Sequence, residues 1–64
     1  MKSLNIQKAD KKTIFEYVQT SLSGDTIIIN NKTSFTKVGT QWYNNSADTF
    51  ISYDDIKFLI ECNI

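Results

Sequence analysis

The chain has no histidine, no arginine and no proline, and its 64 residues include one cysteine and two glycines. Histidine is the commonest general base and a frequent metal ligand, so its absence removes the usual routes to acid–base catalysis and zinc binding. The serines lack an activating base, and two glycines are too few to build a phosphate-binding loop. We therefore expect a protein that is not an enzyme and that uses no cofactor and no metal.

Cysteine usage and the lack of long apolar runs bear on the compartment. Cys62 has no partner for an intramolecular disulfide, which fits a reducing environment, and we expect it to be a small apolar residue of a terminal helix. The first residues form no apolar signal segment, and the longest apolar runs, 27–29 and 58–60, are far too short to span a bilayer. These features predict a protein of the bacterial cytoplasm.

Length and net charge further limit the functions that the protein could have. A chain of 64 residues forms one domain whose core is marginal, so a deep pocket would remove packing that the fold needs. Seven lysines balance seven acidic residues, and a net charge of zero argues against a general polyelectrolyte binder.

Two helices are expected, one near each end. Asp10 is an N-cap candidate, and Ile14, Val18 and Leu22 recur every four residues behind it, so we predict a helix over 11–22 that Gly24 ends in a left-handed C′ conformation. Near the other end, Ser52 is the N-cap candidate of a helix over 53–62. Its capping box and hydrophobic staple are supplied by Asp55, Ile51 and Ile56, and its apolar stripe by Ile56, Leu59 and Ile60.

β-Branched residues and turn signals between the helices predict an antiparallel meander. Strands are expected at 26–29, 33–38, 41–44 and, as a short fourth strand, 49–51. Alternation places Phe35 and Trp42 on one face with the stem of Lys37, and a three-residue turn at 30–32 adds Ile27 and Ile29 to this core face. A two-residue turn would instead place Ile27 and Ile29 on the opposite face. The opposite face then carries Ser34, Thr36, Val38, Gln41 and Tyr43.

The expected fold is therefore a small α+β domain over 1–64, with both helices on one face of a three- or four-stranded antiparallel meander. Its parts are an extended segment at 1–9, a helix at 11–22, the meander at 26–51 and a helix at 53–62.

Binding to another protein is the function that the composition leaves open. An exposed sheet face with an aromatic anchor is typical of interfaces, and an acidic end around Asp54 and Asp55 would attract a basic partner. Adjacent carboxylates in the first turn of a helix diverge by about 100°, so this pair is read as a complement to the helix dipole and not as a catalytic dyad. The candidate partner-binding residues are Thr36, Val38, Gln41, Tyr43, Asp48, Tyr53, Asp54 and Asp55.

Two alternatives remain open. A nucleic-acid-binding module would use Trp42 and Tyr43 for stacking together with Lys2, Lys8, Lys11, Lys12, Lys32 and Lys37. Against it, arginine is absent and the other end of the chain is acidic. The second alternative is a homo-oligomer paired through a strand edge.

Small size, lysine without arginine, and abundant isoleucine and asparagine make the chain similar to small accessory proteins of phages and mobile elements. Many of those, anti-CRISPR proteins among them, inhibit a host or defence protein by occupying its surface. The resemblance implies a partner that is a larger protein or nucleoprotein complex. In its most specific form, it implies a partner that processes nucleic acid.

Overall fold

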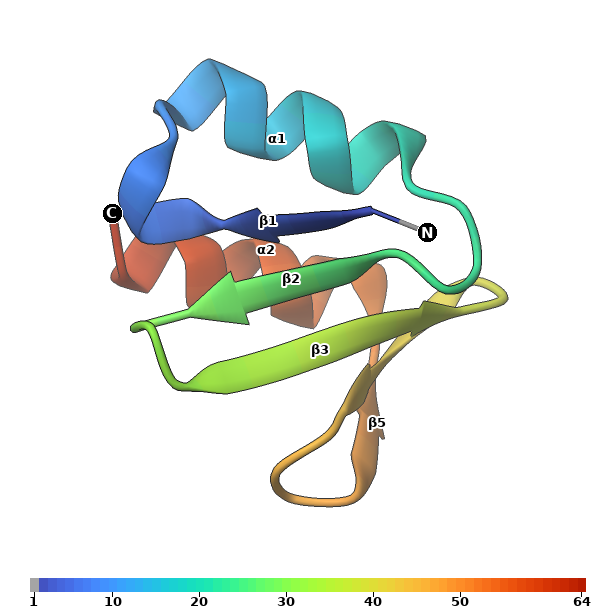
Figure 1. Cartoon of the computed structure of the whole chain (residues 1–64). Helices are drawn as coiled ribbons and strands as arrows, with labels where there is room; N and C mark the ends of the chain where they lie inside the picture. The colour runs from blue at the N-terminus through green and yellow to red at the C-terminus, as the bar shows by residue number, and fades with distance from the viewer. Residues whose placement is uncertain (1) are drawn as a thin grey trace.

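The computed structural model describes residues 2–64; Met1, where the expected 1–9 segment and 1–64 domain begin, lies outside them. Two α-helices and a 3₁₀ helix accompany a five-stranded, mostly antiparallel sheet whose strands follow the order β1-β2-β3-β4-β5 (Figure 1). The elements are β1 (Ser3–Asn5), η1 (Ile6–Lys8), α1 (Lys11–Thr20), β2 (Thr26–Ile29), β3 (Thr33–Val38), β4 (Gln41–Asn44), β5 (Thr49–Ile51) and α2 (Tyr53–Cys62).

Both helices begin at the predicted caps. The Asp10 carboxylate accepts the N–H of Thr13 at 2.7 Å, and the Ser52 hydroxyl accepts the N–H of Asp55 at 3.2 Å. Each bond satisfies one of the donors that the first helical turn leaves free. The span of α2, 53–62, is the one that the sequence predicts.

The end of α1 differs from the prediction. The helix ends at Thr20, not at 22, and Ser21 is already extended with ψ of 143°. The hydroxyls of Thr20 and Ser21 donate to the carbonyls of Glu16 and Tyr17, which competes with continuation of the helix. Gly24 has a φ of +98° but lies in the α1–β2 connection, so it is not the C′ residue. Leu22, expected on the apolar stripe, is 72% exposed.

This difference predicts contrasting effects of two substitutions. Leu22→Ser is expected to change the free energy of unfolding by less than about 0.5 kcal/mol, because the side chain is mostly in water. Ile14→Ala, at a fully buried position of the same stripe, is expected to cost about 2–5 kcal/mol. Urea denaturation of both variants checks the contrast, and a large loss from Leu22→Ser would contradict the early end of α1.

The N-terminal segment adds a strand that the sequence did not predict. β1 pairs in parallel with β2, with Leu4 opposite Ile27, so the sheet has five strands and is not purely antiparallel. η1 then turns the chain toward α1 and buries Ile6. The expected extended segment is thus partly a strand and partly a 3₁₀ helix. Its pairing partner lies 23 residues away in the sequence, where no local pattern signals it.

The meander has the predicted registers. A three-residue turn at 30–32 joins β2 to β3 and places Ile27 opposite Phe35, with Asn30 and Asn31 at φ of +57° and +58°. Asparagine tolerates this left-handed backbone better than most residues do. Val38 lies opposite Gln41 across the second turn, as predicted. The core face is therefore the expected one.

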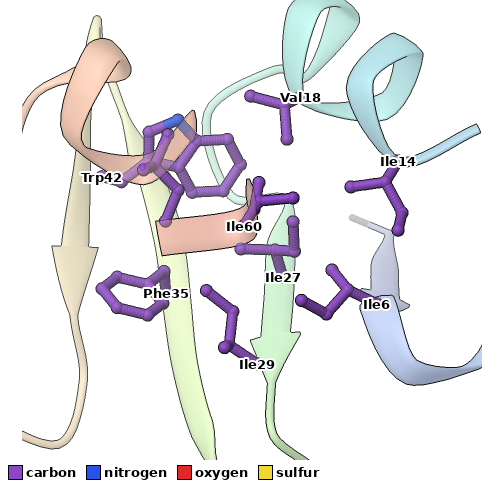
Figure 2. Close-up of a cluster of buried hydrophobic side chains, with 9 residues drawn as sticks. Ile6, Ile14, Val18, Ile27, Ile29, Phe35, Trp42 and Ile60 are labelled. Atoms are coloured by element: carbon purple, nitrogen blue, oxygen red, sulfur yellow. The ribbon is translucent and has the colours of Figure 1, made fainter. Parts of the chain in front are cut away.

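One hydrophobic cluster joins that face to both helices, so both helices pack on the same side of the sheet, as predicted. Figure 2 shows Val18 and Ile14 projecting from α1 toward the sheet, with Trp42 beside α2. The buried members are Ile6, Ile14, Val18, Ile27, Ile29, Phe35, Trp42, Ile56 and Ile60.

Trp42 is the largest fully buried side chain. The ammonium group of Lys37, its cross-strand neighbour, lies 5.4 Å from the centre of the indole ring and 3.3 Å from the carbonyl oxygen of Ser21. The indole Nε1 has no hydrogen-bond acceptor within residues 2–64. Trp42 is held by packing and by the cation above its ring.

Candidate protein-binding surface

The face of the sheet turned away from the helices, here called the open face, carries no charged side chain within residues 2–64. Strand register assigns its members because side chains at paired positions point to the same face. The chain has seven lysines and seven acidic residues, yet none occupies this face. The residues of the open face are Ser3, Asn5, Thr26, Ile28, Ser34, Thr36, Val38, Gln41, Tyr43 and Phe50.

An aromatic pair stands at one side of the open face. Tyr43 on β4 and Phe50 on β5 are opposite each other, with ring centres 5.0 Å apart and planes at 60°. This edge-to-face geometry favours the observed orientation of the two rings. Phe50 is 53% exposed, and Val38, at the end of β3, is 47% exposed. Large apolar groups are thus held in water at defined positions.

The polar part of the open face is also ordered. The Asn45 side chain donates from Nδ2 to Ser34 Oγ at 3.0 Å and to Thr36 Oγ1 at 2.9 Å. Its backbone N–H donates to the carbonyl of Ser34 at 3.0 Å. Because the two hydroxyl groups are already fixed, a partner that binds them loses little additional conformational entropy.

The structure brings four of the predicted binding residues together and separates the others. Thr36, Val38, Gln41 and Tyr43 all lie on the open face, on the neighbouring strands β3 and β4. The acidic candidates do not form one cluster. Asp48 lies in the β4–β5 turn, whereas Asp54 and Asp55 lie in the first turn of α2, beyond the opposite end of β5.

Tyr53 lies on the helical side of the molecule. It lines a solvent-open groove of about 270 Å³ between α1 and α2, together with Phe15, Gln19, Lys57 and Glu61. The Lys57 ammonium lies 5.5 Å from the centre of its ring. Cys62 lies in a terminal helix as predicted, at the end of α2, but its side chain is exposed and does not pack as an apolar residue of the core.

Phe50 is a surface residue that the sequence reasoning missed. The signal was present, because Ile51 was assigned to the hydrophobic staple, on the core side. Strand alternation then turns the preceding residue to the opposite face. What the sequence did not supply was the β4–β5 register, which places Phe50 beside Tyr43.

Of the two aromatic residues predicted for stacking on bases, Tyr43 lies on the open face and Trp42 does not. Trp42 is fully buried, so its ring is closed to bases, and Lys37 lies over that ring. Lys2 lies 5.9 Å from the ring centre of Tyr17. Nucleic-acid binding through the lysines stays a prediction, and a steep fall of affinity with added salt would be its signature. The other lysines of that set, all exposed, are Lys8, Lys11, Lys12 and Lys32.

Asp25 is a buried charged residue with a structural role. Its carboxylate accepts the N–H groups of Leu22 at 3.0 Å and Lys2 at 3.1 Å, and so joins the α1–β2 connection to the residue before β1. The hydrogen bond from Leu22 is the main reason that the pKa of Asp25 is lowered. Burial, reinforced by the charge of Asp25, raises the pKa of Tyr17, whose hydroxyl bonds the carbonyls of Lys2 and Thr26. These groups hold the scaffold together.

Within residues 2–64 the structure gathers no group of three His, Cys, Asp or Glu side chains that could hold a metal ion. In the same part of the chain, no helix has the length and apolar character needed to cross a membrane. Comparison of the chain with models of protein families, with curated proteins and with solved structures finds no match.

Proposed function

We propose that this protein acts without catalysis, by docking its open face on a larger protein. The observation that carries the proposal is an uncharged sheet face with an ordered aromatic pair, Tyr43 and Phe50, in a chain that has seven lysines and seven acidic residues. Interface centres are depleted in charged residues and enriched in aromatic ones. The open face has both properties.

The size of the molecule sets the extent of the contact. A stable interface covers about 800 Å² of each partner, and the surface of the described chain totals 4125 Å². Docking would therefore use about a fifth of the surface. The longest extent of the molecule is 25 Å, and the open face together with the β4–β5 hairpin is the surface proposed to supply this area.

In its sharpest form, the proposal is inhibition of a host or defence protein that processes nucleic acid, by occupation of its surface. This form rests on the resemblance to small phage and mobile-element proteins, and the open face is the surface that would be used.

A pair of photo-crosslinking positions tests the docking surface. A benzophenone amino acid is placed at Thr36 on the open face or at Gln19 in the helix groove, in tagged protein expressed in the source cells. We expect a protein partner to be crosslinked from position 36 and not from position 19. Crosslinks from position 19 alone, crosslinks to nucleic acid, or none from either position would contradict the proposal.

Thr36→Lys tests the same surface by affinity. A charge that becomes buried in the contact is expected to weaken binding of the captured partner about 100-fold, since an unpaired buried charge costs about 3 kcal/mol or more. Gln19→Lys adds the same charge in the helix groove and is expected to bind as the parent does. Circular dichroism confirms that both variants are folded. Equal binding by the two variants would contradict docking through the open face.

A further inference from the structure

We propose that the free edge of β5 accepts an extended, basic segment of the partner protein as an added strand. This inference rests on the proposed docking function and names the partner's chemistry. Strand addition supplies backbone hydrogen bonds along a sheet edge, while side chains beside the edge select the incoming sequence.

The two edges of the sheet differ in how they are covered. In Figure 1, α1 runs alongside β1, and the Tyr17 hydroxyl of α1 bonds the carbonyl oxygen of Lys2 just before that strand. The β4–β5 hairpin projects away from both helices on the other side. Among the described residues, β5 has β4 as its one neighbour in the sheet. Helices commonly protect sheet edges from unwanted pairing, and β5 lacks that cover.

The register shows which backbone groups of β5 are free. In a two-residue hairpin the residues flanking the turn form a hydrogen-bonded pair, here Val38 and Gln41, and such pairs alternate along the strands. The backbone of Trp42 therefore bonds toward β5, to Ile51, and Phe50 opposite Tyr43 is a non-bonded pair. The N–H and C=O of Phe50 point outward.

The charges around this edge favour a basic strand. Asp48 immediately precedes β5, and Asp54 and Asp55 follow it within the first turn of α2. The nearest lysine in sequence, Lys57, lies over the ring of Tyr53. Antiparallel pairing with β5 of a second copy would bring Asp48 toward the acidic end of the other β5, which is unfavourable. A segment with lysine or arginine at both ends is complementary.

The open face supplies the apolar contact. A residue of the added strand that lies opposite Phe50 places its side chain on the same face, next to the exposed ring. An incoming segment that fits therefore has an apolar or β-branched centre between basic ends.

A synthetic peptide tests the edge directly. The probe is a capped heptapeptide of sequence Lys-Thr-Val-Thr-Val-Thr-Lys, and its control has glutamate at both ends. In an NMR titration of the ¹⁵N-labelled chain, we expect the lysine peptide to shift the Phe50 amide and to slow its exchange with solvent. The glutamate peptide is expected to bind at least about tenfold more weakly, because it would meet like charges at both ends of β5. Equal binding, or shifts confined to the helix groove, would overturn the proposal.

Variants of the chain separate the contribution of the backbone hydrogen bonds of β5 to peptide binding from the contribution of the nearby charges. Phe50→Pro removes the outward N–H while sparing the bonds to β4, and it is expected to abolish binding, whereas Phe50→Leu retains it. The triple change Asp48→Asn, Asp54→Asn and Asp55→Asn is expected to weaken binding about tenfold. Glu16→Gln with Glu61→Gln, two exposed acids outside this edge, is the matched control and should leave binding unchanged.

The same variants distinguish this inference from the proposed function. If the partner captured through Thr36 binds equally well to the triple variant, which leaves the open face intact, the edge proposal fails and docking through the open face stands. If the lysine peptide binds as expected but no partner is captured, the edge chemistry is supported and the docking function fails. Light scattering that shows a dimer abolished by Phe50→Pro would identify a second copy as the occupant and overturn the inference.

Discussion

Replacing Trp42 with alanine is expected to leave most of the protein molecules unfolded at 25 °C. The ring is fully buried in the cluster that joins the sheet to both helices. Removing a buried aromatic ring costs about 3–5 kcal/mol, and a core of this size supplies roughly 3–5 kcal/mol of net stability. Far-UV circular dichroism and urea denaturation measure the effect. A variant as stable as the parent would contradict the central position of Trp42.

Trp42→Phe is the matched control. Phenylalanine keeps an aromatic ring in the core and removes the indole N–H, which has no acceptor within residues 2–64. A buried donor without a partner is unfavourable, so its removal offsets part of the volume that is lost. We expect Trp42→Phe to fold and to be clearly more stable than Trp42→Ala.

Asp25 is expected to make folding stability dependent on pH in the acidic range. Its pKa in the folded state lies below the ordinary value of 3.8, mainly because the carboxylate accepts the N–H of Leu22. A lowered pKa means that the ionised group stabilises the fold above the unfolded-state value, and that this stabilisation is lost as the pH falls through the folded-state value. The temperature of thermal unfolding is expected to be constant near neutral pH and to fall below about pH 4.

Asp25→Asn is expected to lower the unfolding temperature at neutral pH. On acidification, the unfolding temperature of this variant is expected to fall less than that of the parent. An asparagine side chain offers one acceptor oxygen, so it does not reproduce both bonds, to Leu22 and to Lys2. Asp10, whose pKa is also lowered, by its hydrogen bonds with Thr13, provides the comparison. Asn is as good an N-cap as Asp, so Asp10→Asn should be milder at neutral pH. Equal effects of the two variants would contradict the bridging role of Asp25.

The part of the candidate surface on β3 and β4 could be predicted from the sequence. Alternation in β3 and β4, with one short turn between them, places Thr36, Val38, Gln41 and Tyr43 on one face. The acidic residues are neighbours in the sequence but flank β5 from opposite ends in the structure, because the strand separates them. Alternation from Ile51 turns Phe50 to the open face, but only the register between β4 and β5 places it beside Tyr43.

By itself, the sequence determined the features that depend on a few adjacent residues. These are the caps at Asp10 and Ser52, the left-handed turn at Asn30 and Asn31, and the alternation that buries one face of the meander. Only the tertiary structure decided the pairing of β1 with β2 and, within residues 2–64, which edge of the sheet stays uncovered, that of β5. Each of these depends on hydrogen bonds or packing with groups distant in the chain, which no local pattern records.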